Sequence, residues 1–166
     1  MTEETSTPAP RGSTCTCLRL RKASRQVTQI YDHHLAAFGL TVNQYSILGH
    51  LRALPGVAIS ALADVMVMDP TSLTRALGPL QRQGLVRAEP DAQDRRTRRL
   101  HLTEDGARSF ALAGAGWRKA QAHIEGALGS DGPPAINAAL DHLIERLRQA
   151  PLVSAANANA NEEGTE

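Results

Sequence analysis

The chain has 166 residues, a formal net charge of +1, and 42% hydrophobic and 21% charged residues, which suits one globular domain rather than a disordered chain. No apolar run is long enough to span a bilayer, and the N-terminus lacks the apolar core of a signal peptide. We therefore expect a cytoplasmic protein with no membrane partner. Aromatic residues make up only 3%, so the core must be built mainly from aliphatic side chains, which favours helices.

In chain order, apolar residues at helical spacing predict a first helix over residues 14–38, which ends at Gly39. Thr41 is a predicted N-cap for a second helix that runs to about Leu54, and Pro55-Gly56 then breaks the chain. The polar ends of the chain, residues 1–13 and 151–166, have the composition of disordered tails.

Two shorter helices are predicted next, the first capped by Ser60 and the second by Asp69. The second helix has a proline at its first turn, where the missing N–H costs nothing, and it reaches about Gln83 before Gly84. Pro79 lies inside this helix and removes one hydrogen bond, so we expect either a kink near Gly78 or an early end.

The following segment predicts two strands, residues 85–89 and 97–102, joined by a polar turn. Thr103 is expected to cap a long helix that runs to about Leu128, and a last helix is expected over residues 135–149. The apolar residues expected to be buried on that last helix are Ile136, Leu140, Leu143, Ile144 and Leu147.

This order of elements predicts a mainly α fold with a small β component: a winged helix-turn-helix within residues 14–150. Within it, residues 41–102 form the predicted DNA-binding part, and the flanking helices, residues 14–38 and 103–149, form the predicted dimerisation region. We find no nucleophile motif, phosphate loop or paired carboxylates, so we expect no enzyme activity and no cofactor.

The helix over residues 70–83 places its apolar residues on one side and hydroxyl and arginine side chains on the other. Recognition helices read base edges in the major groove with such side chains, mostly from their first turns. An exposed polar face can also be ordinary solvated surface, but the arginine-rich hairpin that follows favours DNA. The candidate contacts on this helix are Thr71, Ser72, Thr74, Arg75 and Arg82.

The predicted hairpin is strongly basic around its turn. Between Thr71 and Leu102, seven arginines stand against three acidic residues, a difference of +4. A basic hairpin tip can enter a narrow minor groove or grip phosphates, and Asp94 is expected to pair with Arg96 and to orient its guanidinium. The candidate residues of the hairpin are Asp94, Arg95, Arg96 and Arg98, with Arg99 beside them.

The segment DRRTRRLHLTEDG, residues 94–106, resembles the wing-to-helix signature of the MarR family of transcriptional regulators. Leu102, Thr103 and Gly106 match its Leu-Thr-x-x-Gly part, and the upstream segments 40–48 and 59–86 follow in family order. The resemblance implies a homodimer on double-stranded DNA with a pseudo-palindromic operator, and Arg96 in the minor groove. It also implies a signal site for phenolic or other lipophilic ligands.

Cys17 falls where the organic-hydroperoxide-sensing branch of this family carries its reactive cysteine, and Tyr31 falls on a tyrosine that bonds the sulfur there. Arg21 replaces that branch's second tyrosine. A helix start and nearby positive charge favour thiolate, which peroxide attacks, and Cys15 could then cap the oxidised sulfur. The alternative is that both cysteines simply fill positions at a helix start.

His34 lies on the apolar stripe of the first helix and is either a satisfied interior histidine or part of the ligand pocket. We expect no metal site, because His33 and His34 are adjacent on a helix and neither cysteine has zinc-site spacing. Two other functions remain open. A peroxidase built on Cys17 leaves the arginine hairpin unexplained, and an architectural DNA binder predicts little sequence preference and a steep salt dependence.

Overall fold

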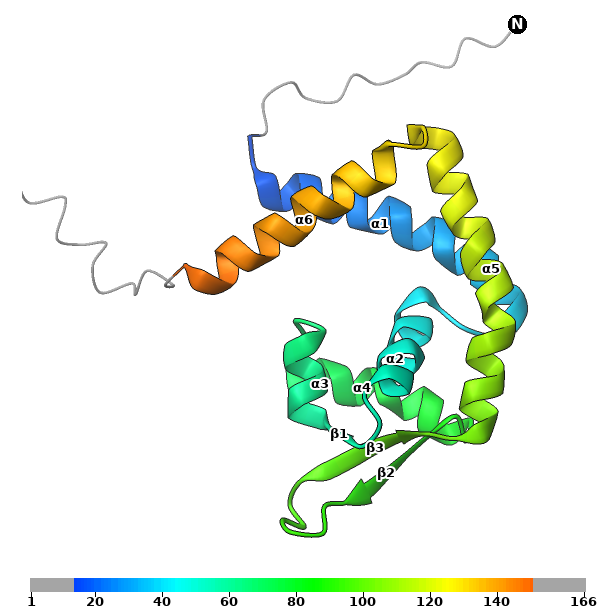
Figure 1. The fold of residues 1–166 in the computed structure, drawn as a ribbon, viewed down its shortest axis with the longest axis vertical. Helices are drawn as coiled ribbons and strands as arrows, with labels where there is room; N and C mark the ends of the chain where they lie inside the picture. The colour runs from blue at the N-terminus through cyan, green and yellow to red at the C-terminus, as the bar shows by residue number, and fades with distance from the viewer. Residues whose placement is uncertain (1–13, 151–166) are drawn as a thin grey trace, which may run out of the picture. The chain divides into compact units, whose positions relative to one another are not determined.

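The computed structural model describes residues 14–150, so the two predicted tails lie outside the described residues. Figure 1 shows α2, α3 and α4 next to a small sheet. In chain order the elements are α1 (Thr16–Leu35), the short 3₁₀ helix η1 (Ala36–Phe38), α2 (Val42–Ala53), β1 (Val57–Ala58), α3 (Ile59–Val65), α4 (Pro70–Arg82), β2 (Val86–Pro90), β3 (Arg98–Leu102), α5 (Glu104–Leu128) and α6 (Gly132–Gln149).

The chain divides into two compact units, one up to His123 and one from Ile124 onward. The first unit contains the sheet, the helices α1, η1, α2, α3 and α4, and most of α5, and it holds the buried core. No helix within residues 14–150 is both long and apolar enough to cross a membrane.

The predicted helix ends and caps around α2 are confirmed. Gly39 adopts a φ of 68° and closes η1, the left-handed conformation that glycine tolerates best. The Thr41 hydroxyl accepts from the backbone N–H of Gln44, and the Gln44 side chain accepts from the backbone N–H of Thr41, which completes a capping box. The first turn of α2 therefore has its exposed amides satisfied, and the helix begins where the sequence predicts.

The helix-turn-helix, α3 followed by α4, begins two residues earlier than predicted. Ala58, not Ser60, is the residue before α3, and it makes no side-chain cap. Asp69 caps α4 as expected, with its carboxylate accepting from the backbone N–H of Ser72 at 2.9 Å. Of the two alternatives predicted at Pro79, a kink near Gly78 or an early end, the early end is wrong, because α4 runs on to Arg82. Pro79 lies in the last turn, and the buried side chains of Leu77 and Leu80 on either side hold this turn in the core.

The sheet has one more strand than the sequence predicts. Its order is β1-β3-β2, and both pairs are antiparallel. β1 is only two residues long, and Val57 pairs with Leu100. These two residues therefore form a strand because they pair with β3. Strands β2 and β3 form the wing hairpin, in register from Val86 opposite Leu102 to Pro90 opposite Arg98.

The start of α5 is fixed against the wing. The Thr103 hydroxyl accepts from the backbone N–H of Gly106 at 3.0 Å and donates to the carbonyl of Gly84 at 2.7 Å, which confirms the predicted cap. A Cβ on Gly106 would lie only 2.1 Å from the carbonyl oxygen of Leu85. Only glycine at position 106 therefore allows the backbones of α5 and the strand entry to approach this closely.

Two expectations for the last helix are wrong. α6 begins at Gly132, three residues before the predicted start, because Pro133 and Pro134 fit the first turn of a helix. None of its residues is buried in this single chain. Ile136, Leu140, Ile144 and Leu147 remain 45%, 37%, 43% and 63% exposed.

The core of the first unit is almost entirely aliphatic, as the composition predicts. Buried side chains from each α-helix up to α5 join those of Leu40, β2 and β3, and no buried side-chain polar atom within residues 14–150 lacks a partner. The fully buried large residues are Leu35, Ile47, Leu48, Leu51, Leu62, Leu73, Leu77, Leu80 and Leu100.

Candidate DNA-binding site and signal pocket

Helix α4 is amphipathic, and its burial separates the two faces that the sequence predicts. Leu73, Leu77 and Leu80 are fully buried and fix the rotation of the helix on the core. The opposite face is open to solvent. The exposed residues on it include all five that the sequence singles out: Thr71, Ser72, Thr74, Arg75 and Arg82.

The first turn of this helix is held by short polar contacts. Hydrogen bonding from the Ser72 side chain, followed by that from the Ser72 backbone N–H, lowers the pKa of the Asp69 carboxyl below its ordinary value. The hydroxyl of Thr74 donates to the carbonyl of Pro70 at 2.8 Å. The hydroxyl proton of Thr74 is therefore already in a hydrogen bond within the helix. Thr71 and Arg75 are exposed beside it.

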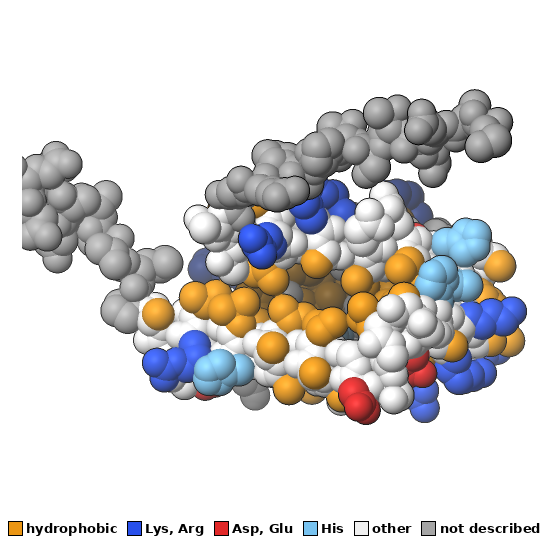
Figure 2. Space-filling view, turned by 90° about the horizontal axis from the view of Figure 1, so that it is seen from above, with side chains coloured by type: hydrophobic (Ala, Val, Ile, Leu, Met, Phe, Trp, Pro, Cys, Tyr) orange, Lys and Arg blue, Asp and Glu red, His pale blue; other side chains and the backbone are white. Residues whose placement is uncertain are grey.

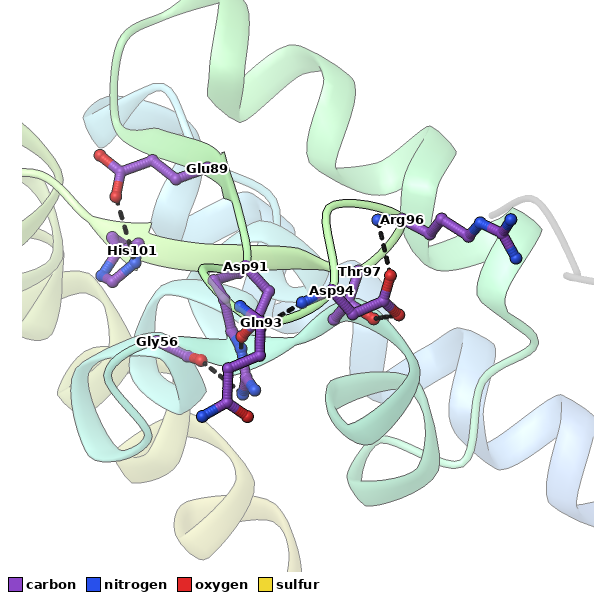
Figure 3. A network of polar contacts seen from close by, with 9 residues as sticks. Gly56, Glu89, Asp91, Gln93, Asp94, Arg96, Thr97 and His101 are labelled. Atoms are coloured by element: carbon purple, nitrogen blue, oxygen red, sulfur yellow. Dashed lines mark hydrogen bonds and ion pairs between the residues drawn. The ribbon is translucent and has the colours of Figure 1, made fainter.

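Asp94 shapes the turn at the wing tip, and the expectation that it pairs with the Arg96 guanidinium is wrong. Its carboxylate accepts from the backbone N–H of Arg96 at 3.0 Å and from the hydroxyl of Thr97 at 3.1 Å. Figure 3 shows the Arg96 side chain pointing away from these contacts. The carboxylate therefore caps the backbone of the turn and leaves the guanidinium extended.

Asp91 holds the base of the wing, and the sequence analysis does not identify it. Its carboxylate accepts from the backbone N–H groups of Gln93 and Asp94, at 2.8 and 3.0 Å, and from Arg99 Nε at 2.5 Å. These bonds, led by the Asp94 amide, lower the pKa of Asp91 from 3.8 to about 2. Figure 3 shows Asp91 between the two sides of the hairpin.

Arg99 connects the wing to the rest of the sheet. Besides its bond to Asp91, it donates to the carbonyl of Gly56 at 3.3 Å, next to β1. The only sequence signal for this arrangement is an acid placed eight residues before an arginine across a predicted turn. We call the contacts of Asp91, Arg99 and Gly56 the wing clasp. Arg99 therefore stabilises the wing, while Arg95 and Arg96 are exposed at its tip.

The remaining arginines of the wing strands make contacts with neighbouring groups. Arg98 donates to the carbonyl of Ala88 at 3.3 Å. Arg87 forms an ion pair with Glu89, whose other oxygen lies 3.7 Å from Nε2 of His101. The positive charge that remains most available on the wing is therefore at its tip.

The three residues predicted for redox or ligand sensing are not brought together in one chain. Cys15 and Cys17 are exposed at the start of α1, whereas Tyr31 lies fourteen residues further along this helix, about 21 Å away at 1.5 Å per residue. Tyr31 packs against the core, and burial raises the pKa of its hydroxyl.

His34 lies at the other end of α1 and is partly buried. Partial burial lowers the pKa of His34 first, and the positive charges of His33, His123 and Lys119 lower it further. The neutral ring is therefore the main form at pH 7. Adjacent residues on a helix usually point apart, but the ring centroids of His33 and His34 are only 5.2 Å apart, edge to face.

A pocket of about 420 Å³ opens between α2 and α5, and the sequence analysis does not predict its lining. Tyr45 and Phe110 stack with centroids 4.6 Å apart, and the Arg52 guanidinium lies 5.7 Å from the Phe110 centroid. The sequence signal for this pocket is that aromatic residues are rare: the chain has five, counted as Phe, Trp and Tyr. The lining residues are Tyr45, Ser46, Gly49, His50, Ala53, Phe110 and Trp117.

His50 gives this pocket a defined polar group. Its Nδ1 lies 2.8 Å from the carbonyl oxygen of Ser46, one turn earlier in α2. A carbonyl only accepts, so Nδ1 carries the proton, and in the neutral ring Nε2 is left as an acceptor. Burial raises the pKa of Tyr45, so this hydroxyl remains protonated. The pocket thus combines aromatic faces with one acceptor and one hydroxyl.

The helix-turn-helix, the basic wing and the exposed face of α4 define a winged-helix DNA-binding protein. A MarR family model matches residues 38–97. The transcriptional regulator HosA of Escherichia coli O127:H6 is 33% identical over 97 residues, which are 55% of this chain and 72% of HosA. The chain belongs to the MarR family of transcriptional regulators.

Two further comparisons bear on the site. The organic hydroperoxide resistance transcriptional regulator of Bacillus subtilis is 30% identical over 91 residues, 55% of this chain and 62% of that protein. The solved structure of the M. tuberculosis regulator MosR in complex with DNA is 33% identical, with a TM-score of 0.74, over 83% of this chain and 99% of that one. Structures of this fold therefore include one with DNA bound.

Proposed function

We propose that the chain is a homodimeric repressor that binds a pseudo-palindromic operator and leaves it when a small aromatic ligand occupies the pocket between α2 and α5. The observation that carries the DNA-binding part is the separation of faces on α4. Its leucine face is buried, and its hydroxyl and arginine face is exposed next to a basic wing tip. Repression follows more simply than activation, because a dimer that covers a promoter needs no contact with polymerase.

On the DNA, the first turns of α4 enter the major groove, where Thr71, Ser72 and Arg75 reach base edges or phosphates. Thr74 and Arg82 contact the backbone beside them. At the wing tip, Arg95 and Arg96 enter the adjacent minor groove, with Arg98 close to the phosphates. Asp94 contributes by holding the turn, since its carboxylate is taken up by Arg96 N–H and the Thr97 hydroxyl.

Two substitutions test this assignment by fluorescence anisotropy with the DNA upstream of the gene. Arg75→Ala should cost about 1–3 kcal/mol at one base position and relax specificity there, because a bidentate base contact is lost. Arg96→Ala should weaken binding on every sequence and leave the fold intact. Arg108→Ala is the matched control, since this exposed arginine of α5 pairs with Asp105 away from both elements.

Unchanged affinity in both variants would remove α4 and the wing from the mechanism. A preference of less than about tenfold, or 1.4 kcal/mol, for the upstream DNA over scrambled DNA would instead support a non-specific architectural protein. The titration should saturate at two chains per duplex, as a dimer on one operator requires. Saturation at one chain per duplex would contradict the dimer.

Homodimerisation is supported by apolar surface on the helices that flank the DNA-binding part. Figure 2 shows hydrophobic side chains open to solvent. Apolar side chains repeat at helical spacing along α6 and are only partly covered in this single chain. Burial of the apolar area that remains exposed would stabilise a dimer by about 25 cal/mol per Å². The exposed large apolar residues on α1 and α6 are Leu18, Leu20, Val27, Ile136, Leu140, Ile144 and Leu147.

The proposed ligand is a small aromatic molecule with a hydroxyl group, such as a phenol. Its ring would lie against Phe110 and Trp117, and its hydroxyl would donate to Nε2 of His50, the acceptor left by the bond to Ser46. The volume of about 420 Å³ lies within the usual range for small-molecule sites. Neither His34, which the sequence analysis considered for the ligand pocket, nor Tyr31 is among the residues that line this pocket.

A second candidate signal is oxidation of Cys17 by an organic hydroperoxide, with DNA release as the result. It is supported by the exposure of Cys17 in the first turn of α1 and by similarity to the hydroperoxide regulator of Bacillus subtilis. Since Tyr31 is far along the same helix, a bond between them would have to come from the second chain of the dimer.

The same anisotropy experiment separates the two signals. If Cys17 is the sensor, one equivalent of cumene hydroperoxide should release the DNA from the reduced protein, and dithiothreitol should restore binding. Cys17→Ser should stay bound throughout. Unaltered binding together with an unoxidised Cys17 by mass spectrometry would exclude the thiol signal and leave the aromatic ligand.

A further inference from the structure

Two histidines that are far apart in the sequence face each other between α1 and α5. Nε2 of His34 lies 3.5 Å from Nδ1 of His123, and the two residues are separated by 89 positions in the chain. Their ring centroids are 5.7 Å apart and the rings are nearly perpendicular, at 75°. Sequence spacing pointed only to the adjacent pair His33 and His34, so this pair comes from the fold alone.

The separation of these two nitrogens suits a shared metal ion better than a hydrogen bond. Hydrogen bonds from N–H groups usually span about 2.7–3.2 Å, so a separation of 3.5 Å is a long one. Two imidazole nitrogens at about 2.0–2.1 Å from a tetrahedral zinc ion lie about 3.4 Å apart. The observed separation of 3.5 Å is therefore close to that of two nitrogens bound to one ion.

We propose that His34 and His123 form a binding site for a divalent transition metal of the zinc type, with water completing its coordination. Imidazole is a good ligand for zinc, copper and nickel. His34 is partly buried and His123 is exposed, so water can reach the open positions. Within residues 14–150 no group of three or more His, Cys, Asp or Glu side chains is placed to hold a metal, so the protein supplies two ligands.

The helix packing holds the two ligands in place. A Cβ on Gly116 of α5 would lie 2.5 Å from the backbone oxygen of His34, so the backbones of α1 and α5 are in close contact at that residue. His123 follows Gly116 by seven residues, two turns further along α5, about 10.5 Å at 1.5 Å per residue. Ligands carried by rigid, closely packed helices lose little freedom when the metal binds.

An ion at this site joins α1 to α5. Binding to the folded chain alone raises its stability by mass action, so zinc should raise the melting temperature through these two residues. Lys119 lies near His34 and its positive charge opposes the ion. The affinity is therefore expected to be that of a two-histidine site with a cation nearby, weaker than that of a structural zinc centre.

Zinc titration of the full-length, tag-free protein tests the proposal by isothermal calorimetry. All proteins carry Cys15→Ser and Cys17→Ser, because the two thiols could bind zinc themselves. The expected result is one zinc ion per chain. His34→Gln or His123→Gln should each lower the affinity by more than about tenfold, since even loss of an outer-shell partner costs 10- to 100-fold. His142→Gln on α6 is the control and should bind as the parent does.

Both ligand variants should fold, because one imidazole is exposed and the other only partly buried. Equal melting temperatures in EDTA would establish this, and the zinc-dependent rise in melting temperature should then be absent in both. Electron paramagnetic resonance with Cu²⁺ should report two nitrogen ligands in the parent and one in each variant. Identical isotherms for the parent and both ligand variants, or no zinc binding by the parent, would overturn the proposal.

Discussion

Replacing Gly106 with alanine is expected to lower the free energy of unfolding by about 3 kcal/mol, near the upper end of what overpacking costs. The added Cβ would lie 2.1 Å from the carbonyl oxygen of Leu85 and 2.7 Å from Cδ1 of Leu102. The first contact is with backbone, so no side chain can rotate away to relieve it. Urea denaturation followed by circular dichroism measures the change.

The strain should also reach the DNA-binding surface, because Leu85 leads directly into β2 and Leu102 ends β3. The matched control is Gly126→Ala in the same helix, where an added Cβ meets nothing within 4 Å. Alanine loses less backbone entropy than glycine when the chain folds, so that variant should be more stable by about 0.5–1 kcal/mol. Equal stability of the two variants would show that the approach of α5 to Leu85 is not tight in solution.

The parts of the fold that the sequence predicts are those controlled by neighbours in the chain. The caps at Thr41 and Asp69 and the helix end at Gly39 each depend on residues within three positions, so the local chemistry fixes them. β1 could not be predicted in the same way. Two residues carry no periodicity, and Val57 becomes a strand only because Leu100 lies beside it.

Among the functional residues too, those set by nearby residues could be predicted, and those set by contacts between distant segments could not. The exposed face of α4 follows from helical periodicity, and the buried leucines agree with it. The role of Asp94 was misjudged because a spacing of two residues does not say whether a carboxylate meets a side chain or a backbone amide. The aromatic pocket and the contact between His34 and His123 each join α5 to a helix far back in the chain, so they required the fold.

The apolar face of α6 was predicted to be buried, but it is exposed in the structure. The difference arises because the structure contains a single chain. An amphipathic pattern shows that a face needs a partner but does not say whether the partner belongs to the same chain. In the single chain Leu140 and Ile144 are exposed. The periodicity was therefore interpreted correctly as amphipathic, and the expected burial would require the second chain of the proposed dimer.

Opening the wing clasp is expected to weaken DNA binding without removing any group that we assign to DNA. Asp91→Ala removes the acceptor for the Gln93 and Asp94 amides and for Arg99, so the hairpin tip loses its fixed position. We expect an affinity loss of about tenfold, similar to the loss of a contacting arginine. Gln93→Ala is the control, because only its backbone amide takes part.

The pH dependence of folding provides an independent test of the clasp. The pKa of Asp91 is lowered from 3.8 to about 2, chiefly by the Asp94 amide and then by Arg99. A lowered folded-state pKa means that the contribution to stability is complete above the unfolded value and is lost as the pH falls toward 2. Between about pH 4 and 2 the parent should therefore lose stability more steeply than Asp91→Ala. Parallel curves, together with unchanged DNA affinity, would mean that the wing is positioned by its strands alone.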